Sequence, residues 1–570
     1  MMKIEVKGHS GCNIDIVRED NDLFIYKSTK DKMYIPRLIR QAEKQQKAAI
    51  VEYQHVRVPH IYAIDQDKGH ASIKMEYVYS RNFIEYFETA GFEQIDYFIK
   101  ALTLFVEKEL QTSQVQEVPS AVTMEKFLDV ERKVAANVLI KDDKEITSIM
   151  TQAKTIFKKL CRQQHIAIPM GVCHGDLTFS NILFNGTNYY LIDFLDSFME
   201  SPLMDIVKIR QDSHHLWSQL MYVKPYDKLR LKIICEKIDT EIDRHFSRYE
   251  WYRKYYQEYQ LLNLLRILQY AKEEKVVDYL KNEIIDILSA LEKNLNVSIF
   301  SDKPSQKANT QASLTFSLIV PAAAYNSDQP NTLPYVFSLD KTGIMICIRS
   351  IQGLNLDVFD NIYFTILQEH VEKFSLDEMF SMQFKRLGMK NSHLVVLEKP
   401  TTSQVETVCQ TLTQEHIDGS IFIKDADGFF TAEARRGNGV AIYALENLEM
   451  VDPRHKSYVS VDDMYYVTNI IEKRIVSHFF NVGGICLEEA GLLHHYYKHL
   501  RQICPDGHLC MSHIVYAMLL DKQKFRPIMA EDYIDYGSES LFNYHKLHNE
   551  NNGVNKLLYN NNFIQNHSNK

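Results

Sequence analysis

The sequence has few of the features that mark secreted, membrane-spanning or disulfide-linked proteins. Its nine cysteines are scattered and no two form a CxxC pair, so we expect free thiols in a reducing compartment, with neither disulfides nor a zinc site. No apolar run approaches the ~18–20 residues that span a bilayer. The start, MMKIEVKGHSG, also lacks the apolar segment of a signal peptide. These absences predict a cytoplasmic protein without membrane insertion.

An excess of positive charge is also absent. The 65 Lys and Arg residues against 74 Asp and Glu give a net charge of −9, which argues against a general nucleic-acid binder. The chain has 570 residues, of which 45% are hydrophobic and 24% charged. At about 100–200 residues per domain, this composition predicts several folded domains and excludes a mostly disordered chain.

The residue pattern divides the first half of the chain into two lobes and a linker. Residues 1–78 contain strand-like runs (KIEVK, NIDIV, LFIYK and IKMEYV) and one helical run, IPRLIRQAEKQQKAAIVEYQ. Residues 79–300 are mostly helical, apart from short strands within 172–195. The segment 301–313, SDKPSQKANTQAS, has no large apolar residue and is typical of a linker, so we expect residues 1–300 to fold alone.

The second half has a different pattern. Residues 314–548 alternate apolar strand-like runs with helices, including a helix at 403–414, which predicts an α/β domain with a mostly parallel sheet. Residues 549–570 are rich in asparagine and are expected to be a disordered tail.

The strongest chemical signal is CHGDLTFSNILFNGTNYYLIDFLDS, residues 173–197. Two strand-like runs flank an Asn-Gly turn, so a hairpin should bring Asp193 beside the loop that holds Asp176 and Asn181. Carboxylate and amide oxygens suit Mg²⁺, and a carboxylate that does not bind the metal can accept a proton from a hydroxyl. We therefore expect Asp176 to be the base and Asn181 and Asp193 the metal ligands. His174 would brace the loop by hydrogen bonding, as part of the catalytic set.

HGDxxxxN followed by a strand that ends in IDF resembles the aminoglycoside phosphotransferase and choline kinase-like family, small-molecule relatives of protein kinases. The resemblance implies an α+β two-lobed protein-kinase-like fold, with ATP as co-substrate and Mg²⁺ as cofactor. It also implies an ATP-dependent phosphotransferase whose acceptor is a hydroxyl group of a sugar or an amino alcohol. In the continuation SPLMDIVKI, an Asp such as Asp205 would support the loop.

The same resemblance implies a nucleotide site in the first lobe. Its residues would be Gly8, Ser10, Gly11, Lys27, Glu43, Met75 and Val78. The small residues of the first turn would let backbone N–H groups approach phosphate. Lys27 would contact a phosphate and pair with Glu43 on the following helix. The segment from Met75 to Val78 would contact adenine.

Residues 314–548 resemble sugar-phosphate nucleotidyltransferases, which have a GT-A-like sheet. The resemblance rests on LIVPAAA, FIKDADGFF and YIDYGSES, and it implies that Asp427, with Asp425 near it, and Asp535 share a Mg²⁺. The segment AAAYNSDQPNTLPY, however, has none of the family's Gly and Arg residues, and Tyr335 stands where the family has Lys. We therefore expect a degenerate domain.

These features favour a small-molecule kinase fused to a degenerate nucleotidyltransferase-like domain, in bacterial surface polysaccharide or cell-wall precursor metabolism. Three alternatives stay open. A bifunctional kinase and nucleotidyltransferase would need an active second domain. An antibiotic-modifying phosphotransferase would need an acidic pocket for polycationic acceptors. A non-catalytic nucleotide-binding scaffold would use both domains without chemistry.

Overall fold

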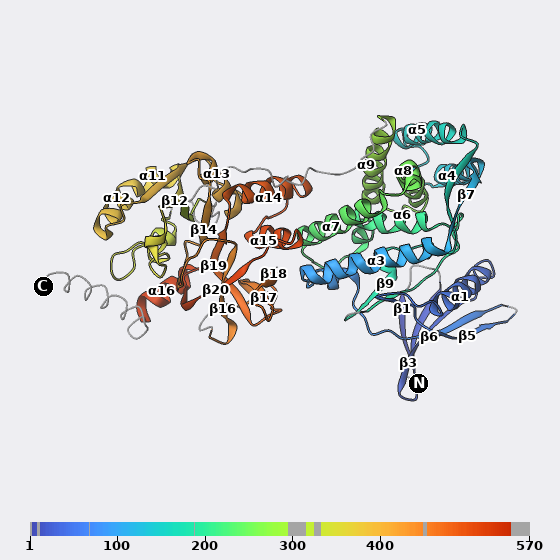
Figure 1. Ribbon diagram of the computed structural model, residues 1–570, viewed down its shortest axis with the longest axis horizontal. Coiled ribbons are helices and arrows are strands. Elements are labelled where there is room, and N and C mark those ends of the chain that lie inside the picture. The colour runs from blue at the N-terminus through green and yellow to red at the C-terminus, as the bar shows by residue number, and fades with distance from the viewer. Residues whose placement is uncertain are drawn as a thin grey trace. The chain divides into compact units, whose positions relative to one another are not determined.

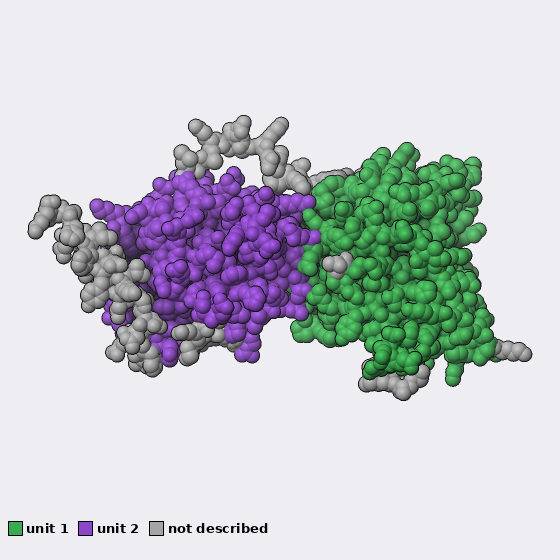
Figure 2. Space-filling view, turned by 60° about the horizontal axis from the view of Figure 1, so that its bottom comes forward, with its two compact units in different colours: residues 1–88, 94–303 green, residues 89–93, 304–570 purple. Residues whose placement is uncertain are grey.

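The computed structural model describes residues 3–7, 12–67, 69–186, 188–293, 315–323, 332–447 and 453–548. Its contacts divide the chain into two compact units (Figures 1 and 2). The first unit comprises residues 1–88 and 94–303, and the second comprises residues 89–93 and 304–570. The predicted linker 301–313 and the predicted tail 549–570 both lie outside the described residues. The domain and lobe boundaries drawn from the sequence therefore stay predictions.

The first unit begins with an antiparallel sheet in the order β1-β2-β3-β6-β5. Its strands are β1 (Lys3–Lys7), β2 (Asn13–Glu19), β3 (Asp22–Thr29), β5 (Ile61–Gln66) and β6 (Ala71–Glu76). Helix α1 (Ile35–Ala49) packs one apolar face on this sheet, with Leu38 and Ala42 buried against Ile73. Alternating burial along β6 gives the sheet the one covered face that period-2 patterning produces.

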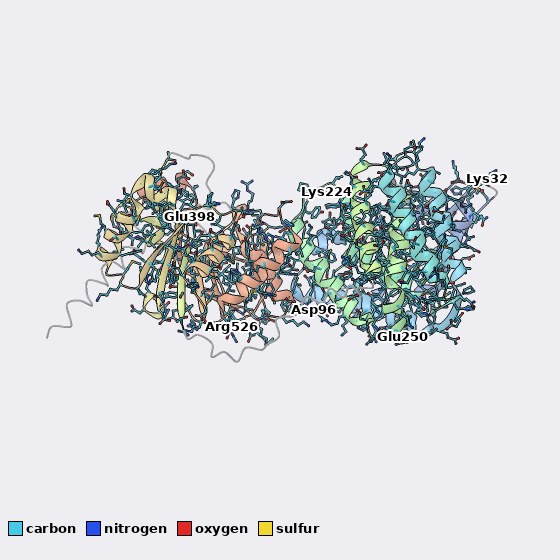
Figure 3. All side chains as sticks on the ribbon, turned by 90° about the horizontal axis from the view of Figure 1, so that it is seen from above. Lys32, Asp96, Lys224, Glu250, Glu398 and Arg526 are labelled. Atoms are coloured by element: carbon cyan, nitrogen blue, oxygen red, sulfur yellow. The ribbon has the colours of Figure 1, made fainter. Side chains whose placement is uncertain are left out.

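The rest of the first unit is mainly helical (Figure 1). Its helices are α2 (Phe83–Phe87), α3 (Phe92–Thr112), α4 (Ser120–Ala136), α5 (Lys144–Cys161), α6 (Pro202–Ser213), α7 (Lys228–Phe246), α8 (Glu250–Leu268) and α9 (Glu274–Glu292). The exposed Glu250, labelled in Figure 3, begins α8. Two short strands, β7 (Gln114–Pro119) after α3 and β8 (His165–Met170) after α5, pair antiparallel with each other. Within the described part of the chain, no helix is long and apolar enough to cross a membrane.

Helix α6 is central to this unit because every one of its residues is buried. The Ser201 side chain accepts a hydrogen bond from the backbone N–H of Leu203, and Pro202 occupies the first turn, where no intrahelical donor is needed. The helix nevertheless carries charged side chains at Asp205, Lys208 and Asp212. Buried charges are retained only with partners, and their partners lie in the loop described below.

The predicted hairpin is present. Strands β9 (Ile182–Asn185) and β10 (Asn188–Leu191) are antiparallel, with Asn185 opposite Asn188. Gly186 in the turn has φ +54°, a conformation that favours glycine. β10 also pairs in parallel with the short strand β4 (Val56–Arg57).

The second unit is built on a mixed sheet. Strands β13 (Ser392–Leu397), β12 (Asn361–Leu367), β11 (Phe316–Pro321) and β14 (Ser420–Lys424) are parallel. Beyond β14, β19 (Phe479–Leu487) runs antiparallel to both β14 and β16 (Gly439–Ala444), and β20 (Arg526–Met529) is parallel to β16. β17 (Ser457–Val461) and β18 (Val467–Glu472) form an antiparallel pair beside β19.

The expectation of a mostly parallel sheet is therefore right for one half and wrong for the other. The parallel half has crossover helices: α11 (Gln368–Phe374), α12 (Leu376–Leu387) and α13 (Gln404–Gln414). The other half contains hairpin-like returns, which sequence alternation alone does not distinguish from crossovers. Helices α14 (Ala490–Ile503) and α15 (Met511–Leu520) follow β19, and α16 (Glu539–His548) ends the described chain. The two units have the fold classes predicted, α+β for the first and α/β for the second.

Candidate functional site

The loop before β9 has a sharply constrained backbone. Gly175 has φ +86°, and a Cβ at this position would collide with the carbonyl oxygen of Leu195. The backbone N–H of Leu195 in turn donates to the carbonyl oxygen of His174 at 2.9 Å. The segment before the hairpin and the segment after it are therefore held side by side, and only glycine permits so close an approach.

His174 and Asp205 fix this loop from inside. The Asp205 carboxylate accepts the backbone N–H groups of His174 at 2.5 Å and Gly175 at 2.7 Å. The His174 Nε2 lies 2.9 Å from the carbonyl oxygen of Ile192, and its Nδ1 accepts the N–H of Asp176 at 3.2 Å. Burial lowers the pKa of His174 to about 4, so the ring is neutral, with its proton on Nε2. His174 has the bracing geometry that we expected of it.

Asp176 lies at the centre of the loop and contacts two side chains. The Nζ of Lys208 is 3.0 Å from one carboxylate oxygen, and the Asn181 amide group donates to the other at 3.1 Å. Burial raises the pKa of Asp176, but the cations Lys208 and Arg266 outweigh that effect and hold it below its usual value. The carboxylate is therefore ionised, held in one position, and able to accept a hydrogen bond from a hydroxyl group.

Asp193 follows β10 and pairs with Lys27 of β3. The Lys27 Nζ lies 2.7 Å from one Asp193 oxygen, and the Lys27 side chain is 5% exposed. Burial alone would lower the pKa of Lys27, but the Asp193 carboxylate reverses that effect and leaves it raised. Asp193 has φ +61°, which is uncommon for a residue with a side chain and is frequent at functional positions.

The donor set fits a magnesium ion. Asn181 uses its amide N–H₂ on Asp176, which leaves its amide oxygen available. Asp193 uses one oxygen on Lys27, which leaves the second. The N–H of Ile192 donates to the carbonyl oxygen of Asn181 at 3.1 Å, so the two candidate ligands come from adjoining backbone. One carboxylate and one amide oxygen, completed by phosphate and water, form a typical Mg²⁺ environment.

The other predicted nucleotide residues have different outcomes. Glu43 is exposed on α1, and the structure does not bring it to Lys27, which pairs with Asp193 instead; this part of the prediction is wrong. The inward face of α1 carries Gln41 and Gln45, so helix periodicity turns Glu43 outward. The Met75 side chain lies in the core under α1, and Val78 is buried beyond β6. Gly8, Ser10 and Gly11 lie outside the described residues.

Two lysines of this site were not predicted from the sequence. Lys208 reaches Asp176 from α6, three residues after Asp205, so both point to the same loop. Lys44 of α1 donates to the carbonyl oxygen of Leu195 at 2.6 Å and pairs with Glu200 at 2.8 Å. The available signal was a helix, SPLMDIVKI, that carries charges in an otherwise apolar run.

In the second unit, the structure brings Asp427 and Asp535 to one pocket of about 560 Å³. β15 (Gly428–Thr431) pairs antiparallel with β21 (Glu531–Asp535), with Gly428 opposite Asp535. Asp425 lines the same pocket and accepts a hydrogen bond from Gln404. The three strand ends thus converge as the sequence suggested.

Both predicted metal carboxylates of that pocket already have partners. The Tyr335 hydroxyl donates to Asp427 at 3.2 Å, and the Lys456 Nζ lies 2.5 Å from Asp535. Lys456 neutralises Asp535 and the backbone N–H of Gly537 donates to its second oxygen at 2.8 Å, so neither oxygen is open and this donor set does not fit an open divalent-metal site.

Comparison with known proteins follows the same division of the chain. No curated protein matches the sequence. A solved structure of a thermostable mutant of aminoglycoside phosphotransferase APH(4)-Ia, in ternary complex with AMP-PNP and hygromycin B, is 8% identical with a TM-score of 0.37, and the match covers 51% of this chain and 94% of that one.

Two solved structures match the C-terminal part. The nucleoside-diphosphate-sugar pyrophosphorylase from Vibrio cholerae RC9 is 14% identical with a TM-score of 0.35, over 40% of this chain and 99% of that one. The inositol-1-phosphate CTP transferase from T. maritima is 12% identical with a TM-score of 0.31, over 42% and 98%. The model of the phosphotransferase enzyme family matches residues 33–226, and the N-terminal half of the chain thus contains a domain of that family.

Proposed function

We propose that the first unit is an ATP-dependent kinase that phosphorylates a hydroxyl group of a small molecule of the sugar or amino-alcohol class. The observation that carries this proposal is the convergence of Asp176, Asn181 and Asp193 with Lys27 in one loop-and-hairpin unit. The set contains an ionised proton acceptor, oxygen ligands for a cation and a buried ammonium for phosphate. Phosphoryl transfer requires these three functions.

Each side chain has a part that its contacts support. Asp176, oriented by Lys208 and Asn181, accepts a hydrogen bond and then the proton from the attacking hydroxyl. The Lys27 ammonium binds nucleotide phosphate from the sheet of the first lobe. His174 and Asp205 keep the loop in its glycine-dependent conformation. Asn181 and Asp193 would hold Mg²⁺, which neutralises phosphate charge when bound.

For the second unit, we propose a nucleotidyltransferase-like domain with altered or absent transfer activity. The pairing of Lys456 with Asp535 and of Tyr335 with Asp427 supports this part of the proposal. A bifunctional enzyme is the second candidate, favoured by the shared pocket that brings both carboxylates together. In either case, the first unit would make a phosphorylated product, and the second unit would bind it or attach a nucleotide to it. Such a sequence of steps would suit bacterial surface polysaccharide or cell-wall precursor metabolism.

The test is ATP consumption by the full chain with a panel of sugars, sugar phosphates, sugar acids and amino alcohols, with products identified by mass spectrometry. Asp176→Asn should lower turnover roughly 10²–10⁴-fold, because a general base acts mainly in the transition state. MgATP affinity should stay within a few-fold. The matched control is Asp142→Asn, at an exposed position, which should keep parental turnover. Near-parental turnover by Asp176→Asn would refute the assignment.

A further inference from the structure

A cavity of the first unit lies beside the loop that holds Asp176, and its lining is rich in cationic side chains. It encloses about 300 Å³, and its wall includes Gly175 and Leu195 of the loop just described. Asp176 is not among its lining residues, and neither are Lys27, Asn181 and Asp193, but Lys208, which pairs with Asp176, is part of the wall. A small molecule in this cavity would reach the loop at Gly175 and at Lys208, beside Asp176.

Six cationic side chains from four helices line this cavity. They are Arg37 and Arg40 of α1, Lys126 and Lys133 of α4, Lys208 of α6 and Arg266 of α8. Helices α4 and α6 both pack on α8, so these side chains are gathered by the core packing of the lobe.

The carboxylates around the cavity balance only part of this charge. Asp196 pairs with Arg40 at 2.7 Å, and Asp176 pairs with Lys208 at 3.0 Å. Asp129 is shared between Lys133 at 2.7 Å and Lys126 at 3.6 Å. Asp196 is the one carboxylate among the lining residues, and Asp129 also pairs with Arg132, which lies outside the lining, so the lining keeps an excess of positive charge.

Two of the cations form no ion pair with a carboxylate within the described ranges, although Arg266 acts on the Asp176 carboxylate at longer range. Arg37 lies 5.5 Å from the centre of the Tyr34 ring, and Arg266 contacts only the amide oxygen of Asn263, at 3.5 Å. The cations also repel one another. Burial lowers the pKa of Lys208 most, and repulsion by Arg266 lowers it further, to about 8. Such crowding is unfavourable in the free protein and is relieved when an anion binds.

We infer that the acceptor of this kinase is an anionic small molecule, a hydroxyl compound that also carries a phosphate or carboxylate group, and that Arg37, Lys126 and Arg266 bind that group. The inference rests on the proposed phosphotransferase function. Guanidinium groups are suited to both anions because their planar N–H pairs match two oxygens at once. The anion would anchor the molecule, and Lys208 would hold Asp176 toward its hydroxyl.

The same charge separates the alternatives left open by the sequence. A polycationic antibiotic would need an acidic cavity, and this cavity is cationic. A quaternary amine would need an accessible aromatic box. Phe198, Tyr259 and Tyr270 do line the cavity, but they stand among its six cations, which disfavour a positively charged ligand. An anionic acceptor is the class that the charge of the cavity favours.

The experiment uses two matched acceptor series with the full chain and MgATP. The hexose series is glucose 6-phosphate, gluconate, glucose and glucosamine; the three-carbon series is glycerol 3-phosphate, glycerate, glycerol and serinol. We expect kcat/KM to be highest for the anionic members. Arg266→Gln and Arg37→Gln should raise KM for those members roughly tenfold or more, since a charge-assisted hydrogen bond contributes on that scale. MgATP affinity should be unchanged.

Arg253→Gln is the matched control, because Arg253 lies exposed on the same helix, α8, and does not line the cavity. Calorimetric titration of the full chain with glucose 6-phosphate and glycerol 3-phosphate, in saturating MgADP, tests binding without turnover. Arg266→Gln should weaken this binding, and Arg253→Gln should not.

The two proposals fail in different ways. If neutral or cationic acceptors are phosphorylated best, or if Arg266→Gln behaves like Arg253→Gln in both assays, the anionic acceptor is refuted and the kinase stands. If the anions bind through Arg266 but no acceptor of any charge is phosphorylated, the cavity is an anion site and the proposed kinase function is wrong. Binding of neither anion, to the parent or to any variant, also refutes the anionic acceptor.

Discussion

At the scale of single residues, Lys208 links the candidate base to the acceptor cavity. It is buried, pairs with Asp176 and lines the cavity. Burial lowers its pKa to about 8, and the neighbouring Arg266 contributes to the same shift. The Lys208 side chain therefore changes its charge near physiological pH. When it becomes neutral, Asp176 loses the positive charge that it is paired with.

This placement gives a prediction for the pH dependence of activity. As pH rises through about 8, Lys208 becomes neutral and Asp176 loses its partner, so kcat/KM should fall. Because the folded pKa is below the unfolded value, this titration adds stability as pH rises from 8 toward 10.5, and the decline is not caused by unfolding. Lys208→Met should lower kcat/KM roughly tenfold or more and remove the alkaline decline. A variant that keeps the parental pH profile would contradict the positioning role.

At the scale of elements, the hairpin and the loop before it act as one unit. Gly175 is the point at which the two segments touch, since its missing Cβ makes room for the Leu195 carbonyl group. Gly186, in the hairpin turn, also has positive φ but has no atom within 4 Å of a built Cβ. Substitutions at these two glycines therefore distinguish the free-energy cost of backbone strain alone from the cost of strain with a steric collision.

Gly175→Ala should therefore be far more harmful than Gly186→Ala. The first change adds a collision to the strain and should cost more than about 3 kcal/mol of stability, with loss of phosphoryl transfer. The second adds strain alone, about 1 kcal/mol, and should keep activity. Scanning calorimetry and ATP consumption on both variants measure the difference. Equal effects would mean that the contact with Leu195 does not determine the loop conformation.

The hairpin also shows how much of the site can be predicted from the sequence. The Asn-Gly turn and the spacing of HGD, Asn181 and IDF are local signals, and they suffice to group Asp176 and Asn181 with Asp193. Lys27 was predicted at the site, but its partner was not. The choice between Glu43 and Asp193 depends on which face α1 turns to the sheet, and the contact of the α6 lysine with Asp176 depends on how that helix packs beneath the loop. A single sequence carries little information about such long-range packing.

The same limit applies to the second unit. LIVPAAA, FIKDADGFF and YIDYGSES indicated its strands, and the resemblance of these segments to nucleotidyltransferases implied the grouping of Asp427 with Asp535. Lys456 follows a segment outside the described residues and pairs with Asp535 across 79 positions, a contact that no spacing rule anticipates. The change from parallel to antiparallel strands beyond β14 likewise depends on long-range packing that no spacing rule predicts.

At the scale of the whole molecule, the two units present different electrostatic arrangements to a nucleotide. In the first unit, the carboxylate Asp193 keeps one oxygen available and stands beside a buried ammonium that suits phosphate. In the second, Asp535 is paired with Lys456 and Asp427 with a tyrosine hydroxyl. We therefore propose that magnesium-dependent ATP binding belongs to the first unit, with Asp193 as the deciding residue.

The most direct test is calorimetric titration of MgATP into the full chain, the Asp193→Ala variant and the Asp535→Ala variant. We predict that the parent binds MgATP and that removal of magnesium with a chelator weakens binding sharply. Asp193→Ala should lose the magnesium-dependent part, because the phosphates lose their bridging cation. Asp535→Ala, the matched change in the other unit, should bind like the parent. Parental binding by Asp193→Ala, or its loss in Asp535→Ala, would contradict this assignment.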